Sequence, residues 1–220
     1  MAPSPRSPSD FRLLADRPLW IRLIALYVGL VFFGTSCGLM IQAGLGNMPW
    51  DVLHQGLSNY LPLSVGAIAV ILSLVVLLLW IPLRQRPGLG TISNALLVGT
   101  FISVTMAVVP PAHALWLQIT YMVSGIVINA VATVLYIVPN FGPGPRDGLM
   151  TGLVEATGKP VFAVRTTIEV VVMAAGWLLG GRFFIGTILY ALAIGPLTQL
   201  MLRLAVRLFG PADPLTSDEA

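Results

Sequence analysis

Two aspartates, Asp51 and Asp147, stand in nearly the same local sequence setting. Each lies two residues after a proline, Pro49 or Pro145, and follows a glycine-rich turn. Proline is favoured in the first turn of a helix, and an acidic side chain there is stabilised by the positive end of the helix dipole. We therefore predict that a short helix begins at each proline, with the aspartates at the helix N-termini.

The two aspartates belong to two short segments, residues 44–57 and residues 140–153, which we call the first and second cassettes. A half-length helix with a Gly/Pro break, in matching positions of two halves, is a sequence sign of a transporter or channel binding site. The position before the aspartate differs, being Trp50 in one cassette and Arg146 in the other, and this asymmetry favours a specific ligand. The alternative is that each cassette caps an amphipathic helix at the membrane surface and seals the bundle.

A second pair of charges, Arg165 and Glu169, lies four residues apart in an apolar stretch, so the two side chains share a helix face and can pair. A charge at the bilayer centre costs about 2.5–3.5 kcal/mol on insertion scales, so such side chains usually face the protein interior or a water-filled path. Glu169 is therefore a candidate for proton exchange. The alternative is a structural ion pair that locks two helices together.

Other side chains carry weaker signals. Residues 34–38 match the G-x-S-x-G pattern of serine hydrolases, but that pattern needs a strand and a sharp turn, whereas this run lies in a predicted helix, where its glycines suit close packing. An intramembrane hydrolase using Ser36 with His54 stays a weaker alternative. His54 and His113 are predicted on one side of the membrane, at the interface. Without metal-ligand spacing, Walker A or dinucleotide motifs, we predict no metal, no cofactor and no enzyme activity.

These residues are embedded in a strongly apolar chain. Of its 220 residues, 56% are hydrophobic and 10% are charged, and the mean hydropathy is +0.89, which is unlike a soluble domain. A helix needs about 20 apolar residues to cross the hydrocarbon core. The stretches that qualify are residues 20–43, 63–83, 89–109, 114–138, 160–180 and 184–202. We predict an all-α, polytopic membrane helix bundle of about six transmembrane helices.

The chain repeats itself at a constant offset of 96 residues, which is the separation of Asp51 and Asp147. Glycine, proline, threonine and tryptophan positions match at this offset without gaps, which chance similarity between apolar helices does not explain. Each half contains three predicted spans, an odd number, so we predict two inverted three-helix repeats, each with a short half-helix after its first span. The predicted division is a disordered basic tail, a first membrane repeat, a second membrane repeat and a polar tail, at residues 1–18, 19–110, 111–208 and 209–220.

The basic residues predict the orientation, because cytoplasmic loops are rich in Lys and Arg. With the N-terminus inside, only Arg182 of the 12 basic residues lies outside. We therefore predict a multi-pass protein of the cell inner (cytoplasmic) membrane with both termini cytoplasmic. Residues 50–61, at 1.5 Å each, reach only about 18 Å, so the cassette helices either enter the membrane halfway or lie at its surface. The basic residues form no cluster with interleaved aromatics, so nucleic acid is not expected.

Four sequence phrases resemble a known family. PWDVLHQGLS, LLLWIPLRQRPGLGT, GPRDGLMTGL and GTILYALAIGPL are similar to segments of the YczE/YyaS-like family of bacterial integral membrane proteins, and the similarity runs over residues 20–203. The resemblance implies a bacterial membrane protein and brings little mechanism with it.

We therefore predict a small-solute secondary transporter or channel with its site between the two cassettes. The expected partners are the lipid bilayer and an unknown small solute, and a homodimer stays open. The alternative is a noncatalytic accessory or regulatory protein that supports another membrane system. The candidate site residues are Pro49, Trp50, Asp51, His54, Pro145, Arg146, Asp147, Arg165 and Glu169.

Overall fold

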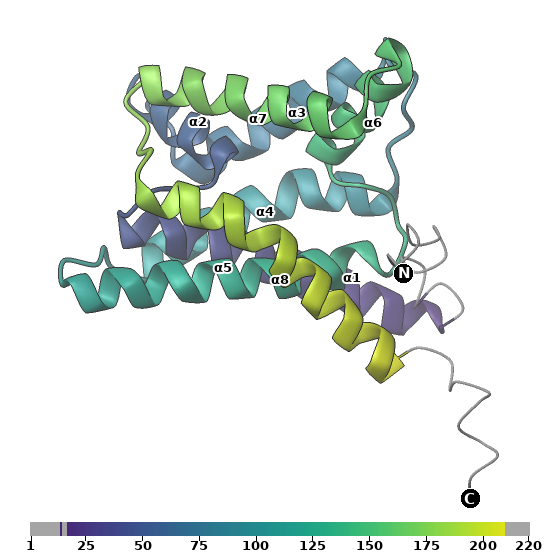
Figure 1. The fold of residues 1–220 in the computed structure, drawn as a ribbon, viewed down its shortest axis with the longest axis horizontal. Helices are drawn as coiled ribbons and strands as arrows, with labels where there is room; N and C mark the ends of the chain where they lie inside the picture. Colours follow the sequence, from purple (N-terminus) through teal and green to yellow (C-terminus); the bar gives the residue numbers. More distant parts are fainter. Residues whose placement is uncertain (1–13, 15–16, 210–220) are drawn as a thin grey trace, which may run out of the picture.

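The computed structural model describes Leu14 and residues 17–209, and these residues form helices without strands. The tails predicted at residues 1–18 and 209–220 lie almost entirely outside the described residues. The helices, drawn in Figure 1, are α1 (Leu19–Ala43), α2 (Pro49–Ser58), α3 (Val65–Trp80), α4 (Leu89–Val108), α5 (Leu115–Ile137), α6 (Pro145–Thr157), α7 (Val161–Leu178) and α8 (Ile185–Phe209).

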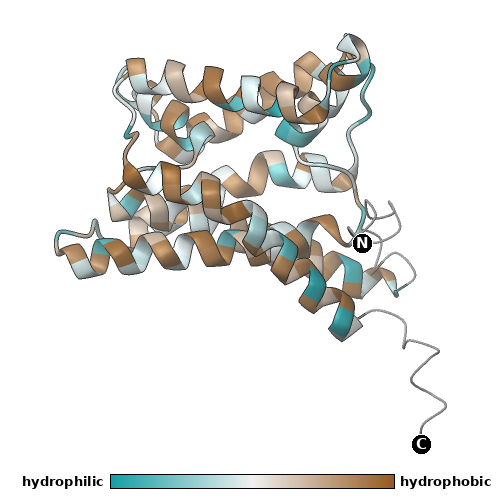
Figure 2. Ribbon diagram, in the orientation of Figure 1, coloured by the Kyte–Doolittle hydropathy of each residue, from teal (hydrophilic) through white to brown (hydrophobic). Residues whose placement is uncertain are grey.

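Each of the six predicted apolar stretches forms a helix, and five of these helices (α1, α4, α5, α7 and α8) are long and apolar enough to cross a membrane. Figure 2 shows hydrophobic residues along the sides of the helices and hydrophilic residues mainly in loops and near helix ends. The predicted all-α membrane bundle is therefore confirmed.

The sixth apolar helix, α3, is shorter than its predicted stretch and has 16 residues, which corresponds to about 24 Å. Its first turn is capped by the Ser64 hydroxyl, which accepts a hydrogen bond of 3.2 Å from the amide of Ala67. It ends at Trp80, just before Pro82, and the chain turns at Arg84, whose φ is 54°. Local capping and turn residues therefore trim the helix at both ends.

The repeat is visible in the positions of the helices, because α5, α6, α7 and α8 each begin 96 residues after α1, α2, α3 and α4 respectively. In Figure 1, α2 lies toward one end of the bundle and α6 toward the opposite end. This is the arrangement that an inverted repeat would produce. The inversion itself stays a prediction.

The centre of the fold is the packing of α1 against α5 and α4. Glycines allow this close approach: a Cβ added at Gly34 would lie 2.5 Å from the Val98 carbonyl oxygen, and one added at Gly38 would lie 2.6 Å from the Cβ of Thr105. The predicted packing role of the residue 34–38 glycines is thus confirmed. Buried apolar side chains such as Leu30 and Ile102 fill the core between these helices.

Candidate functional site

The two cassettes form short helices that begin where the sequence predicts, at Pro49 in α2 and at Pro145 in α6. The helices have 10 and 13 residues, about 15 and 20 Å in length, so neither can cross a bilayer. Asp51 and Asp147 lie in the first helical turns, as expected. The cassettes therefore present two helix N-termini within one bundle.

The cassettes meet at their equivalent positions. The guanidinium carbon of Arg146 lies 4.8 Å from the centroid of the Trp50 ring, which is a cation–π contact. The sequence asymmetry that favoured a ligand is thus partly accounted for by the contact that these two side chains make with each other. The pair also fixes the two helix N-termini relative to each other.

Each cassette is also hydrogen-bonded to the other half of the chain through its backbone. The amide of Gly186, at the start of α8, donates to the carbonyl of Leu45 at 2.8 Å, and the amide of Gly90, at the start of α4, donates to the carbonyl of Phe141 at 2.8 Å. Gly46 and Gly142 have φ values of 119° and 109°, which only glycine adopts without strain. These reciprocal bonds hold each cassette loop in place.

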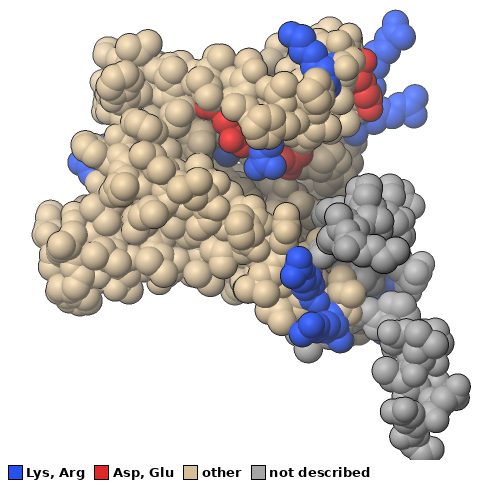
Figure 3. Space-filling view, in the orientation of Figure 1, with Lys and Arg blue, Asp and Glu red and all other residues tan. Residues whose placement is uncertain are grey.

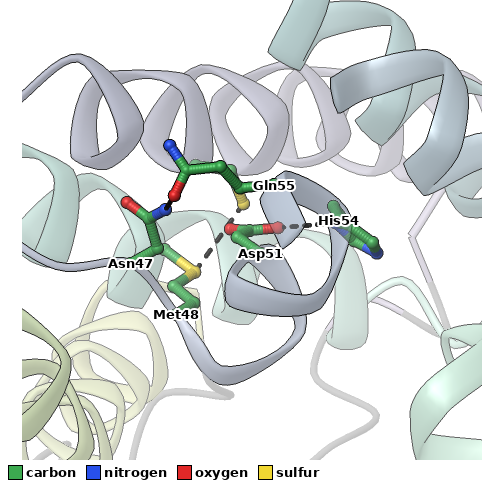
Figure 4. Close-up of polar contacts among 6 residues, drawn as sticks. Asn47, Met48, Asp51, His54 and Gln55 are labelled. Atoms are coloured by element: carbon green, nitrogen blue, oxygen red, sulfur yellow. Dashed lines mark hydrogen bonds and ion pairs between the residues drawn. The ribbon is translucent and has the colours of Figure 1, made fainter. Parts of the chain in front are cut away.

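Asp51 is completely buried, and its Oδ1 lies 3.0 Å from Nδ1 of His54, which is 1% exposed. Figure 4 shows the two side chains pointing toward each other on α2. The other carboxylate oxygen, Oδ2, has no hydrogen-bond partner. The prediction that His54 is interfacial is wrong, because α2 folds into the bundle and turns this face inward. Asp51 and His54 lie three residues apart on one helix, and this spacing could have predicted their contact.

Next to this pair, the Nδ2 of Asn47 donates to Oε1 of Gln55 at 2.8 Å (Figure 4). The backbone amide of Arg182 donates to the same oxygen at 2.8 Å. Asn47 is fully buried, and its Oδ1 has no partner. Neither amide was among the predicted site residues, although each lies four residues from Asp51. The first cassette is therefore a buried polar element, tied by Gln55 to the loop before α8.

Asp147 has a different environment. Its Oδ2 accepts a 2.6 Å hydrogen bond from the hydroxyl of Tyr136 on α5, and the residue is exposed. The Tyr136 ring packs edge-on against Phe33, with ring centroids 5.9 Å apart. Sequence analysis did not single out Tyr136, because no local spacing links it to the cassette. The second aspartate is thus held by α5 and not by its own helix.

A buried polar group joins the central helices. Nδ2 of Asn129 donates to Oγ of Ser36 at 2.9 Å, and the Tyr190 hydroxyl donates to Oδ1 of Asn129 at 3.1 Å. Ser36 itself donates to the carbonyl of Phe33. The structure therefore places Ser36 and His54, the residues of the hydrolase alternative, in two different hydrogen-bonded groups.

Arg165 and Glu169 pair as their spacing predicts, with Nε and Oε1 3.0 Å apart. Their side chains are 60% and 39% exposed, so the pair is not enclosed in the bundle. Glu169 lines a cavity of about 270 Å³ between α7, α8 and the start of α2. Figure 3 shows acidic and basic side chains in the hollow between α7 and α8, on a face that is otherwise mostly uncharged.

A second cavity, of about 340 Å³, lies at the end of the bundle that holds the α4–α5 loop. Its lining includes His113, Gln118 and Arg182, so the histidine and the arginine that the sequence assigned to the outer side lie together. Over the part of the chain that the structure describes, no group of three His, Cys, Asp or Glu side chains could hold a metal ion.

The chain is similar to several bacterial proteins. A Haemophilus influenzae protein, named only as uncharacterized, is 36% identical over 83% of this chain and 84% of its own length. The uncharacterized membrane protein YczE of Bacillus subtilis is 30% identical over 88% and 91% of the two chains, and YyaS of the same organism is 26% identical over 83% and 92%. No solved structure matches.

These relatives confirm the predicted resemblance and, together with the apolar helices, show a multi-pass integral membrane protein. A family model matches residues 20–203, which is most of the chain. The chain therefore belongs to the family of unknown function DUF6198.

Proposed function

We propose that this protein is a small-solute secondary transporter of the inner membrane, with its solute site beside the first cassette. The observation that supports this most directly is a difference between equivalent helix pairs. In the first half, α3 packs along α4, whereas in the second half α7 and α8 scarcely touch. Two halves of related sequence therefore adopt a closed and an open arrangement.

The closed pair depends on glycines. A Cβ added at Gly66 of α3 would overlap the carbonyl oxygen of Gly99 of α4, and one added at Gly99 would overlap that of Gly66. The counterpart of Gly99 in the second half is Gly195 of α8, which has no atom within 4 Å of an added Cβ. The same residue type therefore packs tightly in one half and faces open space in the other.

Inverted-repeat transporters work by moving one helix bundle against another around a fixed site, so that the site is open alternately to the two sides. If the halves exchanged arrangements, α7 would close on α8 and α3 would separate from α4. The cavity lined by Glu169 would then close, and an equivalent space would open in the first half. The two cassettes, joined by Trp50 and Arg146, supply the fixed centre.

The charge distribution supports the orientation with both termini in the cytoplasm. Most described Lys and Arg side chains in Figure 3 lie toward the end of the bundle at which α6 lies in Figure 1. Arg182 lies in the loop before α8, toward the opposite end. This asymmetry follows the positive-inside rule.

Spin-label distances test the exchange directly. In a Cys37→Ala background, one protein carries cysteines at Val75 and Val104 on α3 and α4, and the matched protein carries them at the counterparts Val171 and Leu200 on α7 and α8. All four positions are exposed, and none lines the cavity described above. In liposomes we expect two distances for each pair, because both arrangements are populated.

A rigid bundle that only assists another membrane system would instead give one narrow distance for each pair. That result, found both in detergent and in liposomes, would contradict the proposed transporter. The single-cysteine proteins serve as controls for contacts between different molecules.

A further inference from the structure

We infer that the cavity between α7 and α8 binds a small apolar amine, meaning a protonated amino group attached to a compact hydrocarbon body. The cavity measures about 270 Å³, and its lining is mostly apolar, with Val170, Met173, Phe183 and Ile188 among the side chains. Such a lining suits the hydrocarbon part of a ligand. The polar groups in the lining decide which head group fits.

Among the described residues that line the cavity, Glu169 is the only ionisable one, and the other polar side chains are the hydroxyls of Thr166 and Thr187. A carboxylate beside an anionic ligand would repel it in this apolar setting, where charges are weakly screened. The same carboxylate attracts a cation. The lining therefore selects for positive charge and against negative charge.

Thr187 supplies a second, independent observation. The residue is 2% exposed, and its hydroxyl has no hydrogen-bond partner among the described residues, although buried hydroxyls are nearly always bonded. Its counterpart Thr91 donates a 2.7 Å hydrogen bond to the carbonyl of Pro143. The unpartnered Thr187 oxygen is an acceptor that an ammonium N–H would satisfy once a small shift of the lining exposes it, and this favours an amine over a fully alkylated ammonium.

Arg165 holds Glu169 at 3.0 Å but does not line the cavity. The arginine therefore balances the carboxylate when the cavity is empty, and an entering ammonium group competes with it for the same carboxylate. Replacing Arg165 by Gln should consequently strengthen binding of the amine. This assignment names the substrate class of the proposed transporter and, as such, rests on the proposed function.

Equilibrium binding to the full-length protein in detergent tests the assignment, with radiolabelled 2-phenylethylamine as the probe. We expect saturable binding that unlabelled 2-phenylethylamine displaces, that its N-trimethyl derivative displaces more weakly, and that 3-phenylpropionate does not displace. Glu169→Gln should weaken binding about tenfold, because it removes the carboxylate that pairs with the ammonium group. Glu155→Gln, which changes an exposed acid of α6 that bonds Gln85, should leave binding unchanged.

Thr187→Val should weaken binding a few-fold without loss of folded protein, because the hydroxyl has no partner to lose. Displacement by 3-phenylpropionate as strong as by the amine, or equal binding to the protein and its Glu169→Gln variant, would overturn the assignment and indicate a purely apolar pocket for lipid.

The two proposals can fail separately. If no amine binds but each labelled pair still gives two distances, the assigned substrate class is wrong and the proposed transporter stands. Amine binding together with one fixed distance per pair would leave a binding site without transport.

Discussion

The two halves of the chain contain the same helices in the same order, yet they place similar residues in different surroundings. In an apolar 18-residue segment of α4, 39% of the residues are buried. In such a segment of its counterpart α8, only 17% are buried. Trp80 of α3 covers Gly148 of α6 and donates to the Pro145 carbonyl at 3.0 Å. Its counterpart on α7 is Gly176, which lets the backbone of α2 approach directly.

The duplicated unit therefore sets the course of the chain, whereas single residue differences between the halves set how closely each helix pair packs. The Trp80 indole in one half and the hydrogen atom of Gly176 in the other give the two cassette helices different packing surfaces. The second half is left with an open helix pair and a mostly apolar cavity that Glu169 lines. A protein that needed only a stable bundle would gain burial by closing both pairs.

The largest expected difference between the halves concerns the matched glycines Gly99 and Gly195. Gly99→Ala should lower the free energy of unfolding by about 1–3 kcal/mol, because the methyl group overlaps the Gly66 backbone in a packed contact. Gly195→Ala meets open space and should change the free energy of unfolding only slightly, because the better helix propensity of alanine is offset by the crowding of its Cβ against Pro196, the next residue of α8. Unfolding in mixed detergent and SDS, followed by circular dichroism, measures both values.

The Gly195→Ala variant also tests the proposed exchange of arrangements between the two halves. Gly195→Ala should shift the spin-label distances between α7 and α8 toward the longer value, because the added methyl group hinders closure. Equal destabilisation by the two alanines would show that both helix pairs are closed in solution and would contradict the difference between the halves.

The second expected difference concerns the two aspartates. Asp51→Ala should lower the free energy of unfolding by about 1–3 kcal/mol, because it leaves His54 buried without its partner. Asp147→Ala should have a smaller effect, since this residue is exposed and water can replace the Tyr136 contact.

The control for this comparison is Asp51→Asn, which keeps an acceptor for His54 and should recover part of the loss. The same detergent and SDS titration is used for all three variants. Equal losses for Asp51→Ala and Asp147→Ala would mean that the two cassettes have the same environment, contrary to the structure.

Much of the fold could be predicted from the sequence because its signals are local or periodic. Apolar runs place the helices, and a proline followed by an acid places the starts of α2 and α6. The spacing of four residues predicts the Arg165–Glu169 pair, which the structure confirms. The offset of 96 residues in the sequence reappears in the helix starts.

The tertiary contacts of the site could not be predicted in this way. Trp50 and Arg146 meet only because two segments far apart in the chain fold against each other. His54 is buried because of where α2 packs, although its own residue type suits an interface. The separation of α7 from α8 depends on packing partners, since the glycine on α8 matches the one on α4.

The smallest expected difference concerns the matched hydroxyls of Thr91 and Thr187. Thr91→Val removes a hydrogen bond to the Pro143 carbonyl and one from the Gly88 amide, so it should lower the free energy of unfolding by about 1 kcal/mol. Thr187→Val removes a buried hydroxyl that has no partner, so the free energy of unfolding should be unchanged or slightly higher. Both substitutions keep nearly the same shape, so packing contributes little to either value. A loss for Thr187→Val equal to that for Thr91→Val would show that Thr187 already bonds a protein group, and its hydroxyl would then not be free to accept from an amine.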